Sequence, residues 1–172
     1  MLHSFHERLA YSLEASHEPF WCDVYRKAFP EMREMTLEKR IAQQRAGVDR
    51  LIRLECGRVL KIDEKKRDTV WPDILLEYVS NTKTNAPGWA VKPLTVDYIA
   101  YAFMPTQRVY LLDYLMLKRC WAHYGALWCM QHKHVTARTI TNDGEYRTLS
   151  VAVPIDILRG ALSAAAIIQL DW

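Results

Sequence analysis

Two aspartates in the segment VDRLIRLECGRVLKIDEK (residues 48–65) have a spacing that could bring their carboxylates together. Residues 55–57 separate two short apolar runs and are predicted to form a three-residue hairpin loop. Gly57 would supply the left-handed position that such loops require. With this loop, paired residues have numbers that add to 112, and Asp49 is expected to lie directly opposite Asp63.

Opposed residues of an antiparallel pair point to the same face, with Cβ atoms about 4.5–5.5 Å apart. Lys65 follows Asp63 by two residues and shares that face. Opposed like charges destabilise a strand pair, so stability alone explains the two acids poorly. Mg²⁺ is bound by one or two carboxylates with waters and phosphates, and a nearby lysine can orient a water. The spacing therefore predicts a Mg²⁺ or Mn²⁺ site.

Two other interpretations of the same segment remain open. Lys65 could form an ordinary surface ion pair with Asp63. A one-residue slip of the hairpin would place Glu64, rather than Asp63, opposite Asp49. The alternation of the second strand favours Asp63 and Lys65 on one face.

The elements that must position these residues follow from the periodicity of the chain. Helices are predicted over residues 19–29, 115–128 and 154–170, and residues 36–47 fit a helix or a strand. Strands are predicted over residues 48–54, 58–65, 73–80, 96–103, 108–114, 135–141 and 146–153. Asn142-Asp143-Gly144 would turn the last hairpin. The order indicates an α/β or α+β protein with a mixed sheet flanked by helices.

The length of 172 residues predicts a single domain, residues 1–172, with a substantial core. Half of the residues are hydrophobic and a quarter are charged, which is ordinary for a soluble globular protein. No apolar run reaches the ~18 residues that span a membrane, so no membrane partner is expected. The N-terminal residues lack the apolar centre of an export signal, which favours a cytoplasmic location. The four scattered cysteines are expected to be reduced thiols.

Positive charge gathers around the predicted hairpin. Residues 33–67 contain 11 Lys or Arg against 6 Asp or Glu, whereas the whole chain has a net charge of +3. A local basic field suits an anionic partner such as nucleic acid, although a solvated charged surface gives the same count. Lys61, Lys66 and Arg67 are the expected phosphate contacts.

In this context the chain resembles the PD-(D/E)xK, or restriction-endonuclease-like, nuclease superfamily. The family carries an acid on one core strand and a D/E-x-K motif on the next, and here Val48-Asp49 precedes Asp63-Glu64-Lys65 by thirteen residues. The similar context includes QRAGVDRLI, KIDEKKR and DILLEYVS and covers roughly residues 44–101. A valine stands where the family often has proline. The resemblance implies a mixed sheet core flanked by helices, with DILLEYVS as its next strand.

The resemblance also implies roles for particular residues. Asp49, Asp63 and the backbone carbonyl of Glu64 would bind Mg²⁺ or Mn²⁺, and Lys65 would position the attacking water. Gln44 matches a supporting position upstream. A further acid is often carried by the first helix, where Glu14, Glu18 and Asp23 are candidates and Asp23 fits best.

Other side chains have weaker claims to the site. Glu77 could be a supporting acid, although an acid late in a strand is more often at the surface or ion-paired. Trp89 could stack on a base or pack over the sheet edge. Cys129, His132 and His134 have loose metal-ligand spacing, but no second half of a zinc site is visible.

The sequence therefore supports two functions. The first is a Mg²⁺-dependent nuclease that hydrolyses phosphodiester bonds, with DNA as the favoured substrate. The second is a non-catalytic protein of a phage or mobile element that binds nucleic acid or inhibits another protein on the same scaffold. Such nucleases often form homodimers, but the chain shows no clear interface stripe.

Overall fold

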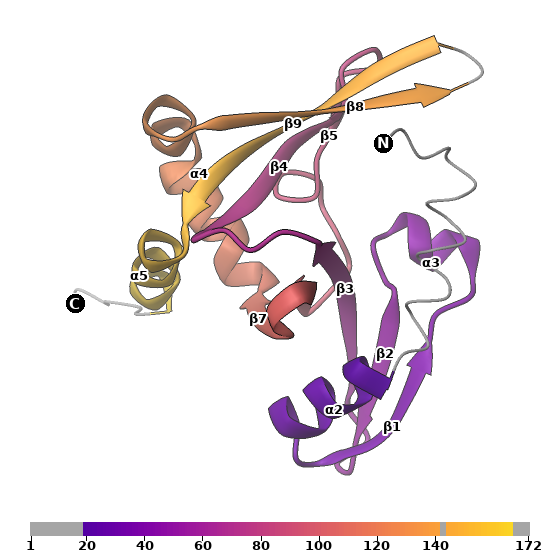
Figure 1. Cartoon of the computed structure of the whole chain (residues 1–172). Coiled ribbons are helices and arrows are strands. Elements are labelled where there is room, and N and C mark those ends of the chain that lie inside the picture. Colours follow the sequence, from indigo (N-terminus) through magenta and orange to yellow (C-terminus); the bar gives the residue numbers. More distant parts are fainter. Residues whose placement is uncertain (1–18, 142–143, 167–172) are drawn as a thin grey trace, which may run out of the picture.

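The computed structural model describes residues 19–141 and 144–166. The elements of these ranges confirm a mixed α+β protein (Figure 1). In chain order they are α2 (Pro19–Ala28), β1 (Met32–Leu37), α3 (Ile41–Arg45), β2 (Arg50–Leu54), β3 (Val59–Arg67), β4 (Asp73–Asn81), β5 (Ala86–Pro87), β6 (Tyr98–Phe103), the 3₁₀ helix η1 (Met104–Thr106), β7 (Arg108–Asp113), α4 (Tyr114–Gln131), β8 (His134–Thr141), β9 (Gly144–Pro154) and α5 (Ile155–Ala165).

Within the described residues the strands form two sheets. The first has the order β1-β2-β3-β6-β7, and the second has the order β5-β4-β9-β8. Strands β1, β2 and β3 are joined as an antiparallel meander, whereas β3 and β6 are parallel. A parallel pair requires a crossover connection, and here the crossover contains β4 and β5 of the second sheet. The chain therefore leaves the first sheet after β3 and returns at β6.

Both faces of the first sheet are buried. On one face, α2 packs Trp21 and Tyr25 against Ile62 of β3 and the alanines of β6. On the other face, Ile99, Tyr101 and Phe103 of β6 pack with the second sheet and with α4 and α5. Figure 1 shows α2 beside the meander, with α4 and α5 on the side of β4 and β9. Because strand residues alternate between faces, Asp63 and Lys65 point toward the second sheet.

The hairpin register agrees with the sequence prediction. Arg50 pairs with Ile62 and Arg53 with Val59, so the residue numbers of each pair add to 112. The N–H of Leu54 donates to the carbonyl of Arg58 at 2.9 Å and closes the loop. Gly57 has a φ of +86°, the left-handed conformation expected for it.

Two predictions about neighbouring elements are wrong. Residues 36–47 do not form one helix, because β1 ends at Leu37 and a short α3 follows over Ile41–Arg45. Strand β4 is not the next strand of the first sheet, because it pairs with β5 and β9 in the second. Its apolar residues Ile74 and Leu76 would fit the centre of either sheet, so the pattern could not identify the partner.

The remaining elements follow their sequence signals. Strands β6 and β7 are joined through η1, and α4 begins after Asp113, whose carboxylate accepts the N–H of Met116 at 2.9 Å as an N-cap. Pro154 precedes α5, and the predicted turn residues Asn142 and Asp143 lie outside the described residues. No helix in the described ranges is both long and apolar enough to cross a membrane.

Candidate metal centre

The open end of the β2–β3 hairpin brings Asp49 and Asp63 together. Asp49 lies one residue before β2, and its N–H donates to the carbonyl of Ile62 at 2.9 Å. The N–H of Glu64 donates to Asp49 Oδ2 at 2.8 Å. This bond orients the Asp49 carboxylate beside β3, and the same carboxylate interacts with that of Asp63.

Asp63 is a buried acid, with 2% of its surface exposed. Its carboxylate accepts a hydrogen bond from the Lys65 ammonium group. Burial raises the pKa of Asp63 to about 7 against the opposing effect of Lys65, and the nearby Asp49 carboxylate adds to the rise. A divalent cation at this position would offset the desolvation cost of the charged Asp63 carboxylate and its repulsion with Asp49.

Lys65 keeps its positive charge in this setting. Burial favours its neutral form, but the carboxylates of Asp63, Asp49 and Glu77 together raise the pKa of the ammonium group above its usual value. The arrangement therefore gives one constant cation beside two acids, on the face of the first sheet that meets the second sheet.

Glu77 joins this cluster from β4 of the second sheet. Burial raises the pKa of its carboxyl group, whereas Lys65, the N–H of Trp89 and Lys92 each favour the charged form. The sequence favoured a surface or ion-paired role for this acid. The structure places it beside Lys65, because the crossover between β3 and β6 lays β4 over this face.

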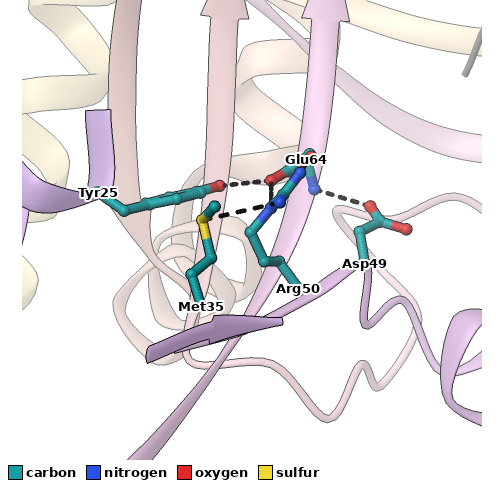
Figure 2. A network of polar contacts seen from close by, with 5 residues as sticks. All are labelled: Tyr25, Met35, Asp49, Arg50 and Glu64. Carbon is teal, nitrogen blue, oxygen red and sulfur yellow. Dashed lines mark hydrogen bonds and ion pairs between the residues drawn. The ribbon is translucent and has the colours of Figure 1, made fainter. Parts of the chain in front are cut away.

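The opposite face of β3 carries a separate buried network around Glu64 (Figure 2). Arg50 Nε donates to Glu64 Oε1 at 2.5 Å, and the side chains of the pair are 4% and 3% exposed. The hydroxyl of Tyr25 also donates to Glu64 Oε1 at 2.9 Å. Burial raises the pKa of Glu64, and Arg50 opposes this effect. With Glu64 committed to this face, the slipped register that would set it opposite Asp49 is excluded.

The network and the acid pair are connected through Glu64, whose side chain belongs to the network and whose N–H bonds to Asp49. Figure 2 shows Glu64 joined through its side chain to Arg50 and Tyr25, and through its N–H to Asp49. Arg50 Nη1 also donates to the sulfur of Met35 at 3.7 Å. The buried pair therefore holds β2 and β3 in register directly behind the two aspartates.

Two of the three supporting residues predicted from the sequence, Gln44 and Asp23, are exposed. Gln44 is exposed, and its amide donates to the backbone carbonyl of Glu38 at 2.9 Å. Asp23 is exposed on α2, which covers the face of the first sheet away from Asp63. Glu14 and Glu18 lie outside the described residues. The structure thus brings Glu77 to the face of the aspartate pair and Asp23 to the far side of the sheet, and it commits the Gln44 amide to Glu38.

The basic residues predicted to contact nucleic acid differ in the face of the sheet that they occupy and in their contacts. Lys61 shares the face of Asp63, whereas Lys66 shares that of Glu64, and the Lys66 ammonium nitrogen is shielded from solvent. Arg67 donates to Asp73 Oδ1 at 2.7 Å and lies over the ring of Phe103, with 5.8 Å between the guanidinium carbon and the ring centroid.

Trp89 does not present its ring to solvent in this structure. It is 6% exposed and belongs to the larger core. Its backbone N–H, rather than its indole, contacts the site through Glu77. Trp89 therefore packs in the protein core in this structure. Its ring could stack on a base only if it left the core.

The loop that contains Trp89 also carries Lys92, which the sequence analysis did not select. Lys92 interacts electrostatically with Glu77. A lysine in a proline- and glycine-containing loop has no periodic signal. Its relation to the hairpin depends on the crossover, so only the packing of the two sheets reveals it.

Comparisons with known proteins give no relative for this arrangement: no family model, curated protein or solved structure matches the chain. In the described part of the chain, no group of three or more His, Cys, Asp or Glu side chains is placed to hold a metal.

The alternative zinc site considered from the sequence involved Cys129, His132 and His134. His134 Nε2 lies 2.7 Å from the carbonyl oxygen of Cys129, and its Nδ1 lies 2.9 Å from the Tyr78 hydroxyl. Protein atoms therefore already contact both nitrogens of that histidine.

Proposed function

We propose that the protein is a divalent-metal-dependent nuclease that hydrolyses phosphodiester bonds of nucleic acid. The observation that carries the proposal is the pair of aspartates opposed across the hairpin, with Asp63 buried and Lys65 on the same face. Opposed acids cost stability in the absence of a cation, and the surrounding residues hold them in place nevertheless. This arrangement favours a functional origin for the pair.

The donor set fits Mg²⁺ or Mn²⁺. Both ions prefer carboxylate oxygens, and Mg²⁺ typically uses one or two protein carboxylates and completes its shell with waters and substrate phosphates. Asp49 and Asp63 supply the carboxylates, and the carbonyl of Glu64 stays a predicted third ligand. When bound, the ion would neutralise charge on a phosphate oxygen and lower the pKa of a coordinated water.

Lys65 supplies the remaining chemistry of the chain. In hydrolysis a water oxygen bonds to phosphorus, the bond to one ester oxygen breaks, and the proton of the water passes to solvent while the leaving oxygen acquires another. The Lys65 ammonium can hydrogen-bond the attacking water and stabilise the negative charge that develops on the phosphate. Because its pKa is raised, Lys65 acts here as a charged donor and not as a base.

Three features support nucleic acid as the substrate class. Basic residues outnumber acidic ones in residues 33–67, which attracts a polyanion. The acid pair and lysine are spaced as in the PD-(D/E)xK superfamily. They also lie at two adjacent antiparallel strands of a mixed sheet with α2 on one face, Asp49 directly before β2 and the other two on β3, in keeping with that resemblance. DNA is the favoured substrate, and a cytoplasmic location belongs to the same proposal.

The test has two independent measurements. Isothermal titration with Mn²⁺ should show binding to the wild type and none to Asp63→Ala. Labelled DNA and RNA, each single-stranded, double-stranded and branched, should be cut only with Mg²⁺ or Mn²⁺, and Lys65→Ala should abolish cutting while it retains metal binding. A wild-type protein that binds neither ion and cuts no substrate form would refute the proposal.

One observation favours a non-catalytic role instead. The described residues contain no cluster of three metal-ligating side chains, and Lys65 already neutralises Asp63. A protein that only binds nucleic acid or another protein on this scaffold would tolerate Asp49→Asn and Asp63→Asn with no loss of binding. These two variants therefore separate the two functions.

A further inference from the structure

The loop from Gly88 to Val96 is laid directly on β4. The N–H of Gly88 donates to the carbonyl of Tyr78, and the N–H of Ala90 donates to the carbonyl of Glu77, both at 3.0 Å. A Cβ atom at Gly88 would lie 2.3 Å from the Glu77 carbonyl oxygen, so the approach requires glycine. The loop is thus fixed to the strand that carries Glu77.

Helix α4 holds the same loop from the other side. The Tyr114 hydroxyl donates to the carbonyl of Lys92 and accepts the N–H of Leu94 at 3.3 Å. The Lys118 ammonium donates to the carbonyl of Val91, and burial lowers the pKa of Lys118. Two polar side chains of α4 are therefore committed to the backbone on either side of position 92.

The hairpin region makes the third contact with the loop. A Cβ atom at Gly47 would lie 2.7 Å from Leu94 Cδ2, and Gly47 has a φ of +86°. The N–H of Thr95 also approaches the carbonyl of Ala46 at 3.4 Å. Residues 46 and 47 directly precede Val48 and Asp49. The loop is consequently anchored to β4, to α4 and to the entry of the acid-bearing hairpin.

These contacts fix the backbone of Lys92, and electrostatic interactions make its side chain the last of a row of alternating charges. Asp63 is bonded to Lys65, Lys65 interacts with Glu77, and Glu77 interacts with Lys92. Lys92 is half-buried, and the Tyr114 hydroxyl fixes its backbone carbonyl. The row places two positive charges on either side of Glu77.

The basic residues that follow Lys65 on β3 do not offer the same access. Lys66 is directed to the opposite face and its nitrogen is shielded from solvent. Arg67 is 15% exposed, and Asp73 and the ring of Phe103 occupy its guanidinium group. A phosphate that approaches Lys65 would therefore meet Lys92 rather than these two residues.

We propose that Lys92 binds a phosphate of the nucleic acid backbone next to the one at Lys65, and that the loop from Gly88 to Val96 exists to hold it there. This inference rests on the proposed function, because it assigns a substrate contact to the same site. Lys92 supplies binding through charge and does not take part in the transfer of protons at the scissile bond.

The experiment compares Lys92→Gln with Lys27→Gln, which removes the same charge from an exposed position on α2, away from the site. Lys92→Arg keeps the charge. Fluorescence anisotropy would measure the affinity of each for fluorescein-labelled DNA, single-stranded and duplex, in Ca²⁺ between about 50 and 300 mM salt, the range over which phosphate contacts are resolved. Near-UV circular dichroism would check that each variant is folded, and Mn²⁺ titration that the acid pair is intact.

Loss of one phosphate contact lowers the slope of log K against log salt by about 0.9, which is roughly an eightfold loss of affinity at about 0.1 M salt. We expect this loss for Lys92→Gln, less than about a twofold change for Lys27→Gln, and recovery in Lys92→Arg. A merely structural lysine would weaken binding without a change of salt slope.

The outcomes separate the two proposals. If the wild type binds Mn²⁺ and DNA but Lys92→Gln has the salt slope of Lys27→Gln, the assignment of Lys92 is wrong and the nuclease proposal stands. If the wild type binds neither the ion nor DNA, the proposed function fails, and the assignment of Lys92 fails with it.

Discussion

Replacement of Asp63 by asparagine should remove a loss of stability that the metal-free protein undergoes as pH rises. The native state buries Asp63 and raises its pKa from 3.8 to about 7, whereas in the unfolded chain this carboxyl group titrates normally. Between pH 4 and 7 the native state therefore binds more protons at this position than the unfolded state. The free energy of unfolding must then fall as pH rises through this window.

The size of the effect follows from the shift. About three pKa units at 1.36 kcal/mol each correspond to about 4 kcal/mol in total, of which about 3 kcal/mol accumulates between pH 5 and 8. The amide of the Asp63→Asn variant cannot ionise and avoids this loss. Titrating groups that do not interact with Asp63 are common to both proteins and cancel in the difference. The lost ion pair with Lys65 changes the absolute level, so the informative quantity is the difference in pH slope.

Urea unfolding in EDTA, followed by the fluorescence of the six tryptophans, would measure both proteins at four values from pH 5 to 8. Wild type should lose about 3 kcal/mol relative to Asp63→Asn over that range. Saturating Mn²⁺ at pH 8 should restore about 2.7 kcal/mol to wild type at about 100 times Kd and leave the variant unchanged. Parallel pH profiles in EDTA would refute the argument from burial.

Further substitutions test the packing around the site, with Gly160→Ala as a control. Arg50→Met should cost about 3–5 kcal/mol in urea unfolding by leaving Glu64 buried without its cation. Addition of Glu64→Leu should recover most of this loss, and a cost of the single change below about 1 kcal/mol would contradict the buried pair. Gly88→Ala should cost about 1–3 kcal/mol through overpacking. Gly160→Ala, in α5 with no atom within 4 Å of the new Cβ, should instead stabilise by about 0.5–1 kcal/mol. Lys118→Met should cost about 1–3 kcal/mol because it removes the donor to a loop carbonyl, and it should lower DNA affinity measured by anisotropy. If the DNA affinity of Lys118→Met is unchanged, the position of the loop does not affect DNA binding.

The hairpin was predictable because its information is local. A three-residue loop with a glycine at the left-handed position determines the register, and alternation then determines the face of every residue. Asp63, Lys65 and Glu64 accordingly lie on the faces that the sequence indicated. Neither property depends on the rest of the chain.

The sequence could not show which strands and side chains that are distant in sequence contact each other. Alternation shows that Ile74 and Leu76 are buried but not which sheet buries them. The sequence therefore offered Glu77 as a possible supporting acid but could not place it near Lys65. Strand β1 was missed for a different reason. It forms the edge of the first sheet and buries none of its residues fully, so it lacks an apolar alternation.

The crossover between β3 and β6 also has a consequence for folding kinetics. Strands β2 and β3 are neighbours in sequence and can pair early, while Asp49 and Asp63 are still hydrated and their repulsion is weak. Desolvation of Asp63 requires the later docking of the second sheet. We therefore expect Asp63 to have a low φ-value, so that its substitution, or a bound ion, changes the unfolding rate while the folding rate is nearly constant. A bound cation would then slow the unfolding of the native state and would not speed its folding.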